Sequence, residues 1–161
     1  MKLYNDLILV RHGESVINDN ISNDLLPLTE FGKIQAKEVS TLLEDKFDIV
    51  ISSVAKRAIM TAKIISNGND PILDVRLLER GWGNKEKNGK ETDEEAKVRF
   101  TAFLKDILDK YNQERIVIVT HGSLIKIAQN VIEEKTLPRD IVNNCTVIKY
   151  DKNKNKIILR K

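Results

Sequence analysis

The sequence predicts an α/β fold, a three-layer sandwich in which a mostly parallel central sheet carries helices on both faces. Segments with the apolar pattern of strands alternate with segments of helical period, an order typical of parallel sheets. Two aliphatic runs, Leu7–Val10 and Ile116–Val119, have the composition of buried strands. Each leads into a histidine followed by a glycine, at His12 and at His121. Neighbouring parallel strands would bring these two histidines to the same edge of the sheet.

The first helix is expected after the loop 11–28. Thr29 is a good N-cap residue, and the period that follows it predicts a helix reaching about Lys46. Its apolar face is predicted to consist of Phe31, Ile34, Val39, Leu42 and Leu43. Glycine in a helix costs roughly 0.5–1 kcal/mol relative to alanine. We therefore expect the loop after the first strand to approach the backbone closely at Gly32.

A second strand is expected over 48–51, and Ser52-Ser53 is expected to cap the helix that follows. The apolar residues of this helix have helical spacing and are Ala55, Ala58, Ile59 and Ala62. Arg57 lies in its first turn, and helical side chains lean toward the N-terminus of their own helix. We therefore predict that Arg57 points toward His12. A short strand over 71–75 begins with proline, which favours an edge position.

The second half of the chain is predicted to contain two helices, a buried strand over 115–120 and a terminal hairpin. Thr92 or Asp93 caps the first of these helices. Its apolar stripe is Ala96, Phe100, Phe103, Leu104, Ile107, Leu108 and Tyr111. The apolar residues of the second helix are Leu124, Ile127, Ala128, Val131 and Ile132. Strands over 146–150 and 157–159 then pair across a turn rich in Lys and Asn.

Length and composition fit a single domain covering residues 1–161. The net charge of +3 permits an anionic substrate, but the lysines are spread along the chain and predict no nucleic-acid binding. Cys145 is the single cysteine, which excludes an internal disulfide and favours a reducing compartment. No apolar stretch approaches the roughly 20 residues that span a bilayer. We therefore expect no membrane contact and a cytoplasmic location, with the oligomeric state left open.

The residues predicted at the sheet edge would form a cationic pocket. Arg11 and Arg57 supply guanidinium groups, which match phosphate oxygens in pairs. Helices beginning near Ser53 and Ser123 would add N-terminal amides, which favour anions. A phosphate is the expected occupant, and a neutral imidazole can attack its phosphorus to give a phosphohistidine. With two histidines and one cysteine a zinc site is not expected, and this chemistry requires no metal or other cofactor.

The leaving alcohol requires a proton, and Glu79 is the best candidate for the acid. It follows an apolar pair and precedes a glycine-containing loop, an environment in which a carboxyl group can be partly buried and act as a general acid. The alternative is that Glu79 is an ordinary solvated carboxylate. Trp82, the only tryptophan, is either an aromatic lid over the substrate or a packing residue.

Together these residues resemble the histidine phosphatase superfamily, the phosphoglycerate mutase-like proteins. The likeness runs from about residue 7 to about residue 150, and its motifs occur in the family's order. They are Arg11-His12-Gly13-Glu14-Ser15 with Asn18, Leu28-Thr29-Glu30-Phe31-Gly32-Lys33-Ile34-Gln35-Ala36, Ser52-Ser53 with Arg57-Ala58 and Thr61-Ala62, Leu78-Glu79, Val119-Thr120-His121-Gly122, and Asn144-Cys145-Thr146. The resemblance implies the phosphoglycerate mutase-like fold.

The resemblance also implies roles for individual residues. His12 would be the phosphorylated nucleophile and Glu79 the proton donor. The implied ligands of the substrate phosphate are Arg11, Asn18, Arg57, His121 and Gly122. Asn18 could instead be a plain turn former. Many relatives have a glycine eight residues after the acid, where this chain has Lys87, so the loop 80–91 is expected to have its own shape.

The expected function is metal-independent hydrolysis of phosphomonoesters, with a small phosphorylated metabolite as substrate. Mutases of the family have extra segments between the acid and the second histidine and after the late strand. This chain is short between Glu79 and His121 and after Tyr150, which favours an open site and hydrolysis. The alternatives are a phosphoglycerate mutase-type transferase, a phosphatase of protein phosphohistidine, and an inactive phosphate-binding module. The loops 17–26 and 80–91 are expected to determine the substrate.

Overall fold

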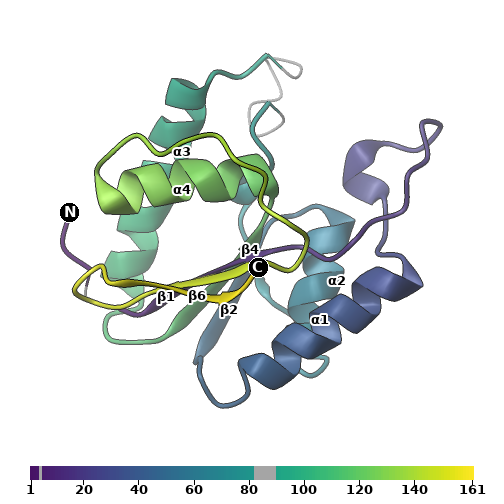
Figure 1. Ribbon diagram of the computed structural model, residues 1–161, viewed down its shortest axis with the longest axis horizontal. Coiled ribbons are helices and arrows are strands. Elements are labelled where there is room, and N and C mark those ends of the chain that lie inside the picture. Colours follow the sequence, from purple (N-terminus) through teal and green to yellow (C-terminus); the bar gives the residue numbers. More distant parts are fainter. Residues whose placement is uncertain (4, 82–89) are drawn as a thin grey trace.

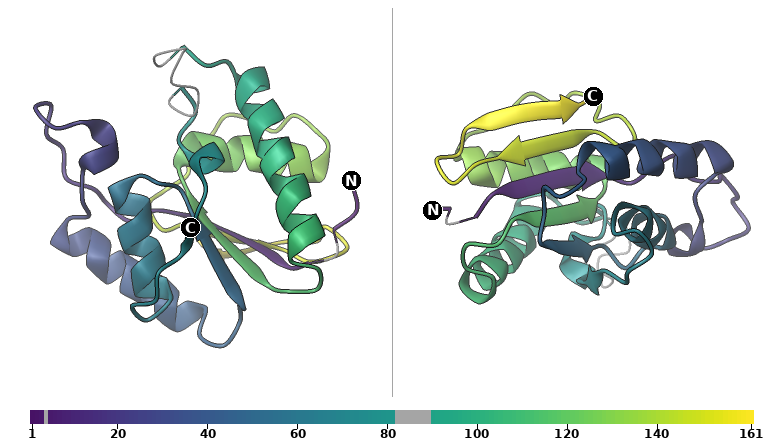
Figure 2. Two further views of the ribbon diagram at one scale, coloured as in Figure 1. Left: turned by 180° about the vertical axis from the view of Figure 1, so that it is seen from behind. Right: turned by 90° about the horizontal axis from the view of Figure 1, so that it is seen from below.

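The computed structural model describes residues 1–3, 5–81 and 90–161. In this part of the chain a six-stranded sheet lies between two pairs of helices (Figures 1 and 2). In their order across the sheet, the strands are β3 (Ile72–Leu73), β2 (Ile49–Ser52), β4 (Ile116–Thr120), β1 (Leu7–Arg11), β5 (Val147–Tyr150) and β6 (Lys156–Arg160). The helices are α1 (Glu30–Leu42) and α2 (Lys56–Ile65) on one face, and α3 (Asp93–Lys110) and α4 (Gly122–Glu133) on the other. The predicted α/β three-layer sandwich is confirmed.

The four strands from β3 to β1 are parallel, and β5 and β6 form an antiparallel hairpin beside β1. The predicted hairpin and the predicted edge position of β3 are therefore both confirmed. The edge strand is shorter than the expected 71–75, because Asp74 accepts a hydrogen bond from the backbone N–H of Arg76 and caps the 3-10 helix η2 (Val75–Leu77).

The central strands are apolar along their whole length because both faces of the sheet are covered. In β1, Leu7 and Leu9 pack against α3 and α4, whereas Ile8 and Val10 pack against α1 and α2. The same alternation occurs in β4, and every residue of that strand is buried. Among the described residues, no helix has the length and hydropathy needed to cross a bilayer.

The predicted face of α1 was wrong in part, since Phe31 is 55% exposed and Ile34 is 57% exposed. The buried side of the helix is instead Gly32, Ala36, Val39 and Ser40. A close backbone contact sets this orientation: a Cβ on Gly32 would lie 2.1 Å from the carbonyl oxygen of Glu14. The expected approach of the first-strand loop to Gly32 is thus confirmed. The helix ends at Leu42 rather than near Lys46, because the chain turns at Asp45 with a φ of 57°.

The predicted cap of α2 was also wrong. The N-cap residue is Ala55, which has no side-chain oxygen, and the structure gives α2 no side-chain cap hydrogen bond. The hydroxyl of Ser52 instead donates to the carbonyl of Ser53, and the hydroxyl of Ser53 contacts a ring nitrogen of His121. Both serines are buried, and the hydroxyl of Ser53 also accepts from the backbone N–H of Ala55 at 3.4 Å, so Ser53 links the start of α2 to His121 without being its N-cap residue.

Candidate active site

The register of the sheet brings the two histidines together. Arg11 lies opposite Thr120 in the parallel pair β1–β4, so a histidine follows each strand at the same level. The backbone N–H of His12 donates to the carbonyl of Thr120 at 3.0 Å. The ring centroids of His12 and His121 are 5.1 Å apart with their planes at 66°. Both rings are almost fully buried.

Arg57 joins the two rings from the first turn of α2, and its side chain points back to the sheet edge as predicted. Its Nε donates to Nε2 of His12 at 3.2 Å. One terminal nitrogen donates to Nδ1 of His121 at 3.2 Å, and the other donates to the carbonyl of Asn23 at 2.7 Å. A single guanidinium group therefore contacts both imidazoles and the loop that precedes α1.

These contacts assign the proton on each ring, because a guanidinium group can only donate hydrogen bonds. Nε2 of His12 must carry a lone pair, so its proton is on Nδ1, which donates to the carbonyl of Gly13 at 2.7 Å. Nδ1 of His121 must also carry a lone pair, so its Nε2–H donates to the hydroxyl of Ser53 at 2.9 Å. The lone pair on Nε2 of His12 therefore faces the guanidinium of Arg57, and the same guanidinium donates to Nδ1 of His121.

Both imidazoles are held in the neutral form. Burial lowers the pKa of His12 to about 3, with the carbonyl of Gly13 opposing this effect and Arg57 and Arg11 adding to it. Burial also lowers the pKa of His121 well below its ordinary value, and His12, Arg57 and Arg11 lower it further. A neutral imidazole with an unprotonated Nε2 is the form that can act as a nucleophile.

Arg11, at the end of β1, places a second guanidinium group beside the rings. One of its terminal nitrogens donates to the carbonyl of Val142, whereas its buried Nε has no partner among the described residues. An unpaired buried donor of this kind is costly unless a ligand satisfies it. Burial lowers the pKa of Arg11, and Glu79 raises it in opposition. Gly122, the first residue of α4, lies against this side chain, since a Cβ there would be 3.5 Å from Nε of Arg11.

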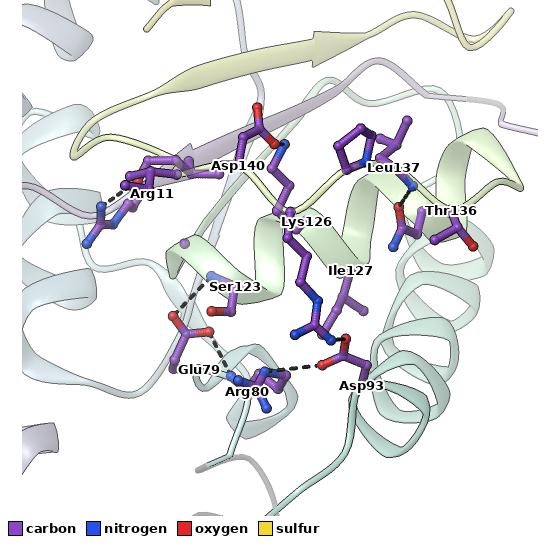
Figure 3. Close-up of a pocket in the computed structure, with 16 residues that line it drawn as sticks. Arg11, Glu79, Arg80, Asp93, Ser123, Lys126, Ile127, Thr136, Leu137 and Asp140 are labelled. Carbon is purple, nitrogen blue, oxygen red and sulfur yellow. Dashed lines mark hydrogen bonds and ion pairs between the residues drawn. The ribbon is translucent and has the colours of Figure 1, made fainter.

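Glu79 is held at the N-terminus of α4. One carboxylate oxygen accepts from the backbone N–H of Ser123 at 3.1 Å, and the other accepts from those of Leu124 at 3.0 Å and Arg80 at 2.7 Å. Its charge also acts on Arg11 and Arg57. Figure 3 shows Glu79 and Arg11 at the same end of a pocket, on either side of Ser123.

The structure does not bring Asn18 to this cluster. Its side chain is exposed, and its amide oxygen accepts from the backbone N–H of Asn20 at 3.0 Å, which is the geometry of a turn former. The predictions for Trp82 and Lys87 lie outside the described residues.

Three supporting residues were given no role at this site from the sequence. Ser53 accepts the ring proton of His121, Thr61 accepts the backbone N–H of Gly13 at 3.0 Å, and the amide nitrogen of Asn144 donates to the carbonyl of His12 at 3.1 Å. All three belong to the motifs that resemble the family, so the sequence marked these positions. Their hydrogen-bond partners could not be predicted, because each contact joins segments that are distant in the sequence.

A cavity of about 450 Å³ opens beside Glu79 and Arg11 (Figure 3). Its outer wall has paired charges: Lys126 with Asp140, and Arg80 and Arg139 with Asp93. The part of the chain that the structure describes contains no group of three or more His, Cys, Asp or Glu side chains that could hold a metal ion.

A sequence model of the histidine phosphatase superfamily (branch 1) matches residues 7–97 and, in an overlapping segment, residues 84–161. The chain belongs to this superfamily, which confirms the resemblance. It is 32% identical to fructose-2,6-bisphosphatase TIGAR B of Danio rerio, over 81% of this chain and 62% of that protein. It is also 31% identical to phosphoglycerate mutase-like protein 4 of Arabidopsis thaliana, over 76% of this chain and 69% of that protein.

Solved structures share the fold. One is a phosphoserine phosphatase mutant from Entamoeba histolytica in complex with phosphoserine, which superimposes with a TM-score of 0.72 at 21% identity, over 96% of this chain and 94% of that chain. The fold is therefore phosphoglycerate mutase-like, as predicted. The chain spans less than two thirds of the length of the fructose-2,6-bisphosphatase that it matches.

Proposed function

We propose that the protein is a metal-independent phosphomonoesterase that works through a phosphohistidine on His12. The observation that carries this proposal is the lone pair on Nε2 of His12, which lies buried, unprotonated and in contact with the guanidinium of Arg57. Arg11 and Arg57 supply cationic donors around this nitrogen, and guanidinium forks match phosphate oxygens.

In the first half-reaction, Nε2 of His12 forms a bond to phosphorus while the bond from phosphorus to the alcohol oxygen breaks. The phosphoryl group in transfer spreads negative charge over three equatorial oxygens. Arg11 and Arg57 hold these oxygens. Neutral His121, whose Nε2–H is bound to Ser53, accepts at Nδ1 a hydrogen bond from a protonated oxygen of the phosphate monoanion.

Glu79 enters this step in its protonated form and gives that proton to the departing alcohol oxygen. In the second half-reaction the carboxylate takes a proton from water, the water oxygen bonds to phosphorus, and the bond to Nε2 of His12 breaks. The products are the free alcohol and inorganic phosphate, and both side chains return to their starting states.

The substrate class is a small phosphorylated metabolite. The cavity beside Glu79, of about 450 Å³, has room for the alcohol part of such a molecule. Its wall carries the ammonium of Lys126 and the guanidinium of Arg139, each paired with an exposed carboxylate. A polar alcohol, rather than a long apolar one, fits this lining.

The test is hydrolysis of p-nitrophenyl phosphate in EDTA, with trapping of the intermediate from a ³²P-labelled substrate. We expect turnover with chelator present and a protein-bound label that is stable in alkali and labile in acid. His12→Ala should lose both the label and the turnover while keeping the fold, and Lys56→Ala, an exposed neighbour of Arg57, is the control. Activity of His12→Ala within tenfold of wild type would rule out His12 as the nucleophile.

Two further outcomes would overturn the proposal. If 3-phosphoglycerate is converted into its isomer without release of phosphate, the protein is a transferase. If no phosphomonoester is turned over between pH 5 and pH 8 although inorganic phosphate binds, the protein is a binding module. A panel of phosphorylated metabolites, with a phosphohistidine-bearing protein included, then identifies the substrate of an active enzyme.

A further inference from the structure

A buried ion pair lies behind the segment that carries Glu79. The carboxylate of Glu91, whose side chain is 1% exposed, accepts from Nε of Arg99 at 2.6 Å and from a terminal nitrogen of Arg99 at 2.8 Å. Glu91 directly precedes the capped start of α3, and Arg99 lies within that helix. Burial opposes ionisation of Glu91, but the hydrogen bonds from Arg99 and from the N–H of Gly81 outweigh it and lower the pKa.

The ion pair also binds the backbone on both sides of the candidate acid. Arg99 donates to the carbonyl of Glu79 at 3.2 Å and to the carbonyl of Arg76 at 2.6 Å. Glu91 accepts from the N–H of Gly81 at 2.9 Å. Gly81 has a φ of 95°, a left-handed conformation that favours glycine, so the chain turns directly after the acid.

A second helix, α4, holds the side chain of Glu79. Its carboxylate is bound by the N-terminal amides of α4, whereas its carbonyl is bound by Arg99 of α3. The direction of the carboxylate therefore depends on two helices, and the ion pair is the contact from α3.

A stabilising role alone does not account well for this pair. Replacing a buried ion pair with apolar residues of similar volume is often neutral or stabilising, because removing two charges from water is costly. Placement of a reacting group is a different matter, because a displacement of about 1 Å can cost about 10²-fold in rate.

We propose that Glu91 and Arg99 are positioning residues that hold Glu79 in place to protonate the leaving group. This inference rests on the proposed function, in which Glu79 is the general acid. The pair does not touch the substrate, and it acts through the backbone of residues 79–81.

The test is the dependence of activity on the leaving group. An alkyl phosphate needs a proton on its leaving oxygen, whereas p-nitrophenol leaves readily without one. Arg99→Lys keeps the charge but cannot reproduce the fork that binds both oxygens of Glu91. We expect it to lower kcat/KM for an alkyl phosphate by about 10- to 100-fold and for p-nitrophenyl phosphate by less than about threefold. Because both substrates are measured on one sample, a partly unfolded variant does not change their ratio.

Arg115→Lys is the matched control. Arg115 forms a similar two-pronged pair with Asp48 and also donates to a backbone carbonyl, but it lies at the far end of β4. The ratio of the two kcat/KM values should equal that of wild type. Glu91→Gln is a second variant of the pair and should change the ratio in the same direction as Arg99→Lys.

A double variant separates positioning from other effects. In a Glu79→Gln background there is no acid left to position, so Arg99→Lys should change the ratio no further. If Arg99→Lys lowers kcat/KM equally for the two substrates, the pair does not position Glu79. The same holds if Arg99→Lys changes the ratio of the two kcat/KM values as much in the Glu79→Gln background as in wild type. Either result leaves the proposed function intact. If Glu79→Gln itself shows no dependence on the leaving group, Glu79 is not the acid, and the inference fails with it.

Discussion

Gly13 and Gly32 lie in backbone contact. A Cβ on Gly13 would be 2.5 Å from the carbonyl oxygen of Gly32, so the residue after His12 and the first turn of α1 fit together only without side chains. Such a contact transmits the position of α1 directly to the backbone beside the nucleophile. It also explains why α1 buries its glycine and leaves Phe31 in solvent.

The first prediction concerns this contact. Gly32→Ala should destabilise the fold by about 1–3 kcal/mol or more, because the added methyl group would overlap the carbonyl of Glu14. Gly122→Ala is the matched control: it also adds a methyl group at a helical glycine, but its contacts begin at 3.5 Å. It should change stability by less than about 1 kcal/mol. Urea unfolding measures both, and similar losses in the two variants would contradict the prediction.

The second prediction concerns Ser53. Ser53→Ala removes the acceptor for Nε2–H of His121 and leaves a buried donor unpaired, which costs about 1–3 kcal/mol. The Nε2–H of His121 should then lose its hydrogen bond while Arg57 keeps the ring in the same tautomer, and ¹⁵N NMR of the histidine side chains would detect the changed Nε2 shift directly. Ser52→Ala is the control, since Ser52 is equally buried but its hydroxyl donates to a carbonyl, whereas that of Ser53 accepts from a ring. An unchanged His121 spectrum in Ser53→Ala would refute the hydrogen bond from His121 to Ser53.

The third prediction concerns Arg57. A lysine at this position has one ammonium and cannot contact His12, His121 and the carbonyl of Asn23 together. Arg57→Lys should lower kcat by about 10²-fold or more, in the range found when one donor to a developing charge is lost. It should also increase proteolysis within the loop 17–26, because the contact to Asn23 is lost. Near wild-type kcat would contradict the role of the guanidinium fork.

The fourth prediction concerns acid stability. The pKa of His12 is about 3 in the folded protein and about 6.5 when the ring is exposed. Below pH 6.5 the unfolded chain therefore binds a proton that the folded chain does not, and stability falls as the pH is lowered toward 3, by up to about 1.4 kcal/mol per pH unit. In urea unfolding without phosphate, His12→Gln should lose less stability than wild type between pH 7 and pH 4.5. Equal acid sensitivity would mean that His12 is not held neutral.

The sequence was sufficient for the fold class and for the meeting of the two histidines. Continuous aliphatic runs are typical of parallel strands whose two faces are both covered by helices. Neighbouring parallel strands bring the residues that follow them to the same edge of the sheet. The position of Arg57 in a first turn also predicted the direction of its side chain, because that direction is a property of helix geometry. Of the two predicted caps of α3, Thr92 and Asp93, the structure has Thr92, which forms a local capping box with Glu95.

Contacts between distant segments could not be predicted in the same way. The hydrophobic period of α1 suggested that Phe31 was buried, but the backbone contact at Gly32 turned that side outward. Ser53 is a residue type typical of N-caps, and its role beside His121 depended on the register of β2 and β4, in which Ser52 lies opposite Val119. In the sequence Glu91 and Arg99 look like ordinary surface charges, because only their burial in the fold distinguishes them from exposed residues.

The backbone of His12 depends on a segment far along the chain. Cys145 donates its N–H to the carbonyl of Arg11 at 3.1 Å, and Arg11 in turn donates to the carbonyl of Thr146, also at 3.1 Å. During translation, His12, Arg11, Arg57 and His121 are all synthesised before this segment. A nascent chain that ends before residue 144 therefore contains all four of these side chains but lacks the contacts that hold the backbone of residues 11 and 12, so the candidate site is complete only after residues 144–146 have been synthesised.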